Sequence, residues 1–144
     1  MVRKVHEVMT RDVETVLPTD TVRDAAESMR ELNVGILPVC DEAGHVLGVL
    51  TDRDVVVRTV ALGMDASVTS VADVMSANVQ VCFEDDDAGS VLERMKKQQL
   101  RRFVVVDTEE VLVGIVTLGD VSHDFDERRV GEALEGISEP APLQ

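Results

Sequence analysis

Two short motifs of one design hold the residues best suited to bind a ligand. In each, an apolar strand-like run ends at a threonine and an aspartate follows three residues later, as Thr51 with Asp54 and Thr117 with Asp120. A threonine hydroxyl and the free backbone N–H groups at a helix start can hold a phosphate. A carboxylate one turn further on can accept hydrogen bonds from both neighbouring hydroxyls of a ribose. Threonine and aspartate are also good helix caps, so spacing alone favours capping and leaves ligand binding open.

The two motifs belong to an internal duplication that spans most of the chain. A shift of 66 residues aligns residues 5–55 with residues 71–121 without a gap, and Gly48/Gly114 is one of the identical pairs. A single offset over that length indicates two copies of one structural unit. We therefore predict a first repeat at residues 1–63, a connector at 64–70, a second repeat at 71–125, and a C-terminal tail at 126–144, partly disordered and with a short helix near 130–134.

Hydrophobic periodicity predicts the order strand, helix, strand, strand, helix in each repeat. In the first repeat we expect a helical turn at 5–9, an extended run at 13–17, a helix near 22–32 capped by Thr19 or Asp20 with Leu32 on its apolar face, strands at 36–40 and 46–50, and a helix at 54–62. In the second repeat we expect a turn at 71–75 capped by Ser70, an extended run at 79–83, a helix with apolar residues from 88 to 95, and strands at 103–106 and 111–116. One repeat could hardly bury its apolar faces alone, so the expected fold is α/β, with two β-α-β-β-α units packed sheet to sheet about a pseudo-twofold axis.

Composition argues against several classes of function. The formal net charge is −14, and a surface this acidic repels nucleic-acid phosphates and anionic membranes. No apolar run approaches the length of a membrane span. Cys40 and Cys82 have no metal-type spacing, and we expect them to be buried free thiols in a reducing, cytoplasmic setting. The sequence contains no evident nucleophile–base pair and no glycine-rich phosphate loop, so we do not expect an enzyme.

Taken together, the motifs resemble a tandem pair of CBS (cystathionine β-synthase) domains, also called a Bateman module. The resemblance covers roughly residues 5–125 and rests on motifs that occur twice, in order and at one spacing. They are the Val-x-x-Val-Met openings, the strands Leu37-Pro38-Val39-Cys40-Asp41 and Phe103-Val104-Val105-Val106-Asp107, and the two Gly-h-h-Thr-x-x-Asp ends, where h is apolar.

The resemblance implies a stand-alone regulatory ligand sensor with no obligate cofactor. Its ligand would be adenosine-containing (AMP, ADP, ATP, S-adenosylmethionine or NAD(H)) and would bind in the cleft between the repeats. The resemblance also implies a homodimer that forms a flat disc of four CBS domains and signals to an unidentified protein partner.

Roles for individual residues follow from the same resemblance. The adenine pocket would be formed by Ile36, Leu37 and Pro38, and the base would be flanked by the backbone at Thr15 and Val16 or at Val81 and Cys82. A phosphate would be bound by Arg53 in the first motif, or by Arg101 and Arg102 in the second repeat. A pair of solvated arginines is the alternative for the last two.

The repeats differ at these positions. Gly119 stands where the first motif has Arg53, and Val104 stands where the first repeat has Pro38. We therefore expect two inequivalent sites, one stronger than the other.

Two other interpretations stay open. In the first, the protein is a ligand-free interaction module whose threonines and aspartates are only helix caps and whose acidic surface docks a basic partner. In the second, it is a metal- or redox-responsive CBS protein. Its candidate groups are Cys40, Cys82, His6, His45 and His123, which are scattered and would have to be gathered by the fold or by a dimer.

Overall fold

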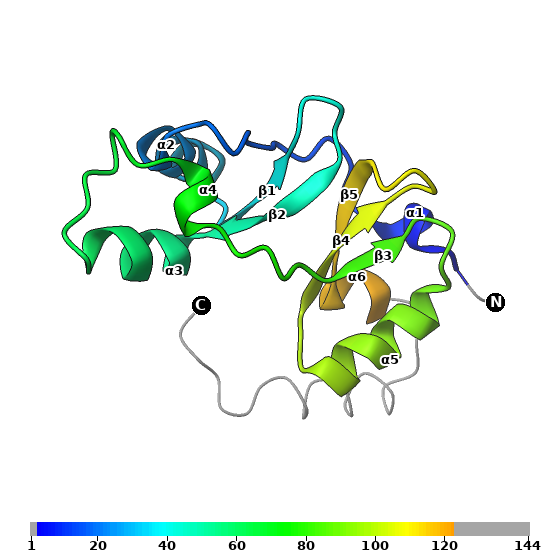
Figure 1. Ribbon diagram of the computed structural model, residues 1–144. Helices are drawn as coiled ribbons and strands as arrows, with labels where there is room; N and C mark the ends of the chain where they lie inside the picture. Colours follow the sequence, from blue (N-terminus) through cyan, green and yellow to red (C-terminus); the bar gives the residue numbers. More distant parts are fainter. Residues whose placement is uncertain (1–2, 123–144) are drawn as a thin grey trace. The chain divides into compact units, whose positions relative to one another are not determined.

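The computed structural model describes residues 3–122, and its elements follow the duplication (Figure 1). The first repeat contains α1 (Val5–Val8), α2 (Val22–Leu32), β1 (Ile36–Cys40), β2 (Val46–Thr51), α3 (Asp52–Val55) and the π-helical segment η1 (Val56–Val60). The second repeat contains α4 (Val71–Val74), β3 (Val81–Phe83), α5 (Ala88–Gln98), β4 (Arg102–Val106), β5 (Leu112–Thr117) and α6 (Leu118–Ser122). The predicted α/β class is confirmed. The predicted tail at 126–144, its helix near 130–134, and His123 lie outside the described residues.

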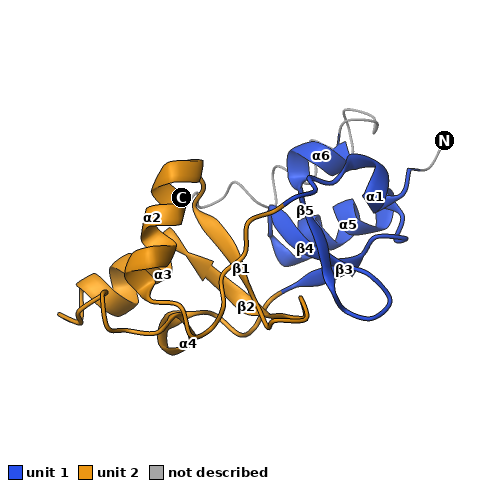
Figure 2. Ribbon diagram, turned by 90° about the horizontal axis from the view of Figure 1, so that it is seen from above, with its two compact units in different colours: residues 1–12, 80–144 blue, residues 13–79 orange. Residues whose placement is uncertain are grey.

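The chain forms two compact units that are offset from the sequence repeats (Figure 2). Unit 2 is residues 13–79, and unit 1 joins residues 1–12 to residues 80–144. The opening helix of each repeat therefore packs with the body of the other repeat. Val5 of α1 is fully buried in the core of unit 1, and Val71 of α4 is fully buried in the core of unit 2.

The opening segments explain the glycine of the repeated motif. In unit 1 the N–H groups of Thr10 and Ile115 each donate to the other residue's carbonyl, at 2.8 and 3.0 Å. Ser76 and Val49 make the same pair of bonds in unit 2, at 2.9 and 3.0 Å. A Cβ on Gly114 would lie 2.6 Å from the Thr10 carbonyl oxygen, and one on Gly48 would lie 2.5 Å from that of Ser76. No side chain fits in so short a gap, so both strands need glycine there.

The two sheets differ in their first strand. Unit 1 has the order β3-β4-β5, with β3 parallel and β5 antiparallel to β4. Unit 2 has only the antiparallel pair β1-β2, and the expected run at 13–17 makes a single parallel bridge between Val16 and Val39.

Two prolines account for this reduction of the first strand. In unit 1 the N–H groups of Val104 and Glu84 donate to Gln80 and Val106, at 3.2 and 3.0 Å, and so hold the two ends of β3. The residues 66 positions earlier are Pro38 and Pro18. Proline has no N–H to donate to the ladder. In unit 2 the ladder keeps the two bonds made by Val16. Its N–H donates to the Pro38 carbonyl and its carbonyl accepts from the Cys40 N–H, each at 3.0 Å.

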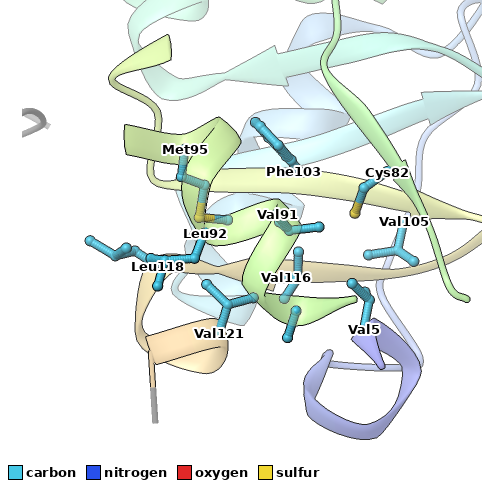
Figure 3. Packing of buried hydrophobic residues seen from close by; sticks show 11 residues of the cluster. Val5, Cys82, Val91, Leu92, Met95, Phe103, Val105, Val116, Leu118 and Val121 are labelled. Carbon is cyan, nitrogen blue, oxygen red and sulfur yellow. The ribbon is translucent and has the colours of Figure 1, made fainter. Parts of the chain in front are cut away.

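Each unit has its own apolar core, built mainly of Val, Leu and Met side chains, and the core of unit 1 also contains Phe103. In unit 1, Val91, Leu92 and Met95 of α5 belong to one buried cluster with Phe103 of β4, Val116 of β5 and Leu118 of α6 (Figure 3). The expected stripe on α2 is buried at Val22, Ala25 and Met29, whereas Leu32, expected on that stripe, is 48% exposed. Leu32 is the last residue of the helix, where the buried face has already run out.

Several predicted helix ends need correction. The helix after β2 begins at Asp52 rather than Asp54 and continues from Val55 as η1. The side chain that caps α2 is Thr21, whose Oγ1 accepts from the Asp24 N–H, and neither Thr19 nor Asp20 has this role. Asp20 instead accepts from the Leu17 N–H in the preceding turn. Ser70 stands at the start of α4 as predicted, but its hydroxyl makes no capping bond. Within residues 3–122, no helix combines the length and apolar character needed to cross a bilayer.

Candidate functional site

Both Thr–Asp motifs are capping boxes. At the Thr51 corner, which ends β2 and begins α3, the Thr51 N–H donates to Asp54 Oδ2 and the Asp54 N–H donates to Thr51 Oγ1, each at 3.0 Å. At the Thr117 corner, which ends β5 and begins α6, the corresponding bonds with Asp120 are 2.8 and 3.2 Å long. Each side chain satisfies a backbone N–H that the first helical turn leaves free. The capping interpretation is therefore confirmed at both corners.

Capping uses only part of each aspartate. The carboxylate has two oxygens and about four acceptor positions, and the capping bond takes one position on Oδ2. Asp54 Oδ1 lies 3.9 Å from Arg58 Nε, which is a loose contact, and 14% of the Asp54 side chain is exposed. Asp120 is likewise only partly buried. Each corner can thus cap its helix and still accept hydrogen bonds from a ligand hydroxyl.

The strand register decides which side chains stand beside each threonine. Ile36 is the partner of Thr51 across the β1–β2 pair, and Arg102 is the partner of Thr117 across β4–β5. Arg101, the residue before Arg102, is also held at this corner, because the Leu118 N–H donates to the Arg101 carbonyl at 2.6 Å. Both predicted arginines of the second repeat therefore lie at the Thr117 corner, and both are exposed.

The Thr51 corner carries the opposite charge pattern. Asp52 replaces the buried Leu118, and its N–H donates to the Gly35 carbonyl at 2.9 Å. A Cβ on Gly35 would lie 2.9 Å from Asp52 Oδ2, so a larger residue would meet this carboxylate. Arg53, the predicted phosphate ligand, is exposed, and its backbone N–H donates to Asp52 Oδ1 at 2.8 Å. The carboxylates of Asp52 and Asp54 offset the positive charge of Arg53 and Arg58 at this corner. The Thr117 corner therefore suits a phosphate better than the Thr51 corner does.

Three of the residues assigned to the adenine site have their side chains buried in the cores. Leu37 and Val16 are 1% and 6% exposed in the core of unit 2, and Cys82 is fully buried in that of unit 1. Only their backbone could touch a ligand. Pro38 is buried and its carbonyl is already bonded to Val16. Ile36 is half-buried and stands beside Thr51.

The backbone at Thr15 and Val81 is placed differently from its neighbours. Val16 uses its N–H and C=O to bond to β1, and successive residues of an extended chain direct these groups to opposite sides. Thr15 therefore directs its N–H and C=O away from β1, and Val81 directs its own away from β4. These outward groups lie on the side of each edge segment that faces away from its sheet.

Arg94 is a residue that sequence reasoning missed. Its Nη2 donates to the Val81 carbonyl at 2.9 Å, and its Cζ lies 4.7 Å from the centroid of the Phe103 ring. The available signal was the repeat alignment, in which an arginine on α5 stands against Ser28 on α2.

Burial disfavours the reactive form of both thiols. Burial raises the pKa of Cys40 to about 11 and that of Cys82 to about 12. The thiolate is the reactive form, and it is disfavoured in both cores. Among residues 3–122, no group of three His, Cys, Asp or Glu side chains is placed to hold a metal ion.

Comparison with known sequences finds the same family twice in the chain. The model of the CBS domain matches residues 5–59 and 71–126. An uncharacterized protein YlbB of Bacillus subtilis is 40% identical over 138 residues, which cover 94% of this chain and 92% of that protein. Hypoxic response protein 1 of Mycobacterium tuberculosis is 30% identical over 137 residues, with 95% of each chain covered.

Solved structures with the same architecture include ligand complexes. CBSX2 in complex with AMP is 27% identical with a TM-score of 0.70, and the match covers 82% of this chain and 92% of CBSX2. The CBS domain pair of MJ0100, in complex with 5′-methylthioadenosine and S-adenosyl-L-methionine, is 26% identical with a TM-score of 0.73, over 87% and 97% of the two chains. Hypoxic Response Protein I with two coordinated zinc ions is 31% identical with a TM-score of 0.75, over 86% and 100%. The protein belongs to the CBS-domain family and carries its domains as a tandem pair.

Proposed function

We propose that this CBS-domain pair is a regulatory module that binds an adenosine-containing ligand at its Thr–Asp corners. The candidates are AMP, ADP, ATP, S-adenosylmethionine and NAD(H). The observation that carries the proposal is the partial use of Asp54 and Asp120, since each caps a helix through Oδ2 and keeps acceptor positions for a ribose. The AMP complex of CBSX2 and the S-adenosyl-L-methionine complex of MJ0100 support the same class of ligand.

Each part of the ligand has a chemical match at the corners. The aspartates suit the paired ribose hydroxyls, and the threonine hydroxyls stand beside them. At the Thr117 corner, Arg101 and Arg102 supply local positive charge for a phosphate or carboxylate against a net charge of −14. At the Thr51 corner, Ile36 and the outward backbone at Thr15 suit an adenine base. Binding would then shift the protein towards the state that the ligand prefers, by no more than its difference in affinity for the two states.

The same proposal includes a cytoplasmic homodimer that signals to a protein partner. Support comes from a run of exposed apolar side chains on η1 and the loop after it: Val56, Val57, Val60, Leu62, Met64 and Val68. Exposed apolar residues that gather on one surface are typical of an interaction site. Analytical ultracentrifugation of the wild type and of Val60→Asp tests it. We expect a dimer that dissociates in the variant, and a wild-type monomer would remove this part of the proposal.

The test of ligand binding is thermal unfolding with the five candidate ligands. A ligand at a hundred times its dissociation constant stabilises by about 2.7 kcal/mol, which raises the melting temperature by roughly 5 to 10 °C. Asp54→Asn and Asp120→Asn are the informative variants. The asparagine oxygen can still accept the capping bond, whereas its NH₂ group cannot accept from a ribose hydroxyl. Loss of the shift in either variant, with an unchanged melting temperature of the free protein, would place the ribose there.

A ligand-free interaction module is the second candidate function. It is favoured by the same capping boxes, because both corners satisfy their backbone groups without any ligand. No thermal shift with any of the five ligands at millimolar concentration would favour this candidate over the nucleotide sensor.

A further inference from the structure

We infer that Arg94 occupies the base-binding edge of unit 1, so that the base of the proposed ligand binds at the Thr15 edge of unit 2 alone. The inference rests on the proposed function and adds to it the number of bases bound and the side chain that sets this number.

The edge in question is the free side of β3. Cys82 bonds to β4 on both sides of Val105, so Val81 directs its N–H and C=O outward. An adenine amino group donates to a carbonyl while the neighbouring ring nitrogen accepts from an N–H, which matches the two backbone groups of such a residue. Val81 starts β3 at the end of the sheet where β5 ends at Thr117. A base on Val81 would therefore belong with a ribose on the Thr117 corner.

Arg94 already makes the contact that a base would make there. Its Nη2 donates to the Val81 carbonyl at 2.9 Å, which is the position of an adenine amino group. Its guanidinium also lies over the Phe103 ring, with Cζ 4.7 Å from the ring centroid. The side chain is half-buried, and the two contacts hold its planar end in one orientation. A base would have to displace both contacts to reach Val81.

Unit 2 lacks each part of this arrangement. Ser28 stands in place of Arg94 and Leu37 in place of Phe103. A serine is too short to span from its helix to the sheet edge, and leucine offers no ring for a cation. Within residues 3–122, no side chain donates a hydrogen bond to the Thr15 carbonyl, and Thr15 is exposed. The edge that is closed in unit 1 is open in unit 2.

The test is isothermal titration calorimetry of the full chain with AMP. We expect one AMP per chain in the wild type, and two in Arg94→Ser, which copies the residue of unit 2. The reciprocal change, Ser28→Arg, should weaken binding by at least about tenfold, because an arginine there can reach the Thr15 carbonyl. Lys97→Ser is the control, since it removes the same charge from the same helix at an exposed position.

The outcomes distinguish a failure of the role of Arg94 from a failure of the proposed function. Two equal sites in the wild type, or Arg94→Ser that binds one AMP as the wild type does, would overturn the role of Arg94 and leave the proposed function standing. A second AMP gained equally by Lys97→Ser and by Arg94→Ser would assign the effect to charge and also overturn it. If neither the wild type nor Arg94→Ser binds any of the five ligands, the proposed function itself fails. Since Ser28→Arg alters only unit 2, it tests the inference even if Arg94→Ser unfolds.

Discussion

Unit 1 and unit 2 are built from copies of one sequence, and they differ most along the edge of the sheet beside their Thr–Asp corners. In unit 1 the edge is a full strand, β3, covered at Val81 by Arg94. In unit 2 it is a single bridge at Val16, bounded by Pro18 and Pro38. The cores and capping boxes are alike. Edge chemistry can diverge after a duplication because it depends on few side chains that the core does not use.

The Thr51 and Thr117 corners also differ in the charge of the residues beside them. Arg102 stands opposite Thr117, whereas the apolar Ile36 stands opposite Thr51. Asp52 adds a negative charge to the Thr51 corner where the other corner buries Leu118. Two copies with one backbone thus offer different chemistry: a cationic corner in unit 1 and an open, less polar edge in unit 2.

The largest expected effect is on the reactivity of the two cysteines, one in each core. Because burial raises their pKa to about 11 and about 12, both are protonated at neutral pH. We expect iodoacetamide at pH 8 to label both in the folded protein more slowly than in the unfolded chain by on the order of a hundredfold or more. Site-resolved mass spectrometry measures this, and Cys82 should be slower than Cys40.

The same shifts predict the direction of a pH effect on stability. The folded pKa values lie above the ordinary value of 9.0, so the folded state holds these protons more tightly. The stabilisation is complete below pH 9.0 and is lost as the pH rises through 11 and 12.

Rapid labelling of one cysteine alone in the folded protein would contradict the labelling prediction. It would show that the unit with that cysteine opens independently of the other unit, and that the two cores are not alike.

The next effect is on the glycines that admit the opening segments. In Gly48→Ala and Gly114→Ala the new Cβ would lie within 2.6 Å of a backbone oxygen, so the opening segment must move. We expect each to lower the free energy of unfolding by about 2–3 kcal/mol, measured by urea denaturation. Gly119→Ala is the control, because its nearest neighbour would be Thr117 Oγ1 at 3.7 Å. A loss in one variant only would show that just one opening segment is firmly packed.

Loss of the threonine caps comes next. Thr51→Ala and Thr117→Ala each remove an acceptor for the aspartate N–H, and we expect each to cost about 1 kcal/mol of stability. The two costs should match, because the bonds are 3.0 and 3.2 Å long. Thr19→Ala, at an exposed position outside the caps, should change stability by less than about 0.5 kcal/mol. A negligible cost at both corners would mean that the threonines are retained for a ligand rather than for the helices.

The smallest effect concerns the missing strand of unit 2. Pro38→Val returns an N–H that can donate to the Glu14 carbonyl, as Val104 donates to Gln80 in unit 1. A hydrogen bond contributes about 0.5–1.5 kcal/mol, and loss of the rigid proline offsets about 0.4–1 kcal/mol of it. Stability should hardly change, so the measurement is hydrogen exchange. We expect the new backbone amide at this position to exchange slowly, and rapid exchange there would show that Pro38 alone does not suppress the strand.

Most of the secondary structure could be predicted from the sequence, because the periodic apolar residues are the ones that the cores bury. The α2 stripe, the β1 strand at 36–40 and both capping boxes could be predicted from local patterns. The first-strand difference was also present in the sequence, as Pro18 and Pro38. It was missed because a proline removes a bond only where the register turns its nitrogen towards a partner. Leu32 was misassigned because periodicity does not say where a helix leaves the core.

The duplication, the α/β class and the two Thr–Asp corners could be predicted from the sequence alone, because they follow from residue spacing within each repeat. The CBS-domain family was indicated by the resemblance of the repeated motifs and is shown by the family match. The structure was needed to find that the opening helix of each repeat completes the other repeat's unit, that Arg102 pairs with Thr117, and that Arg94 reaches Val81. These contacts join residues that are far apart in the chain or on different elements. Their geometry depends on strand register and on side-chain reach, which no local pattern encodes.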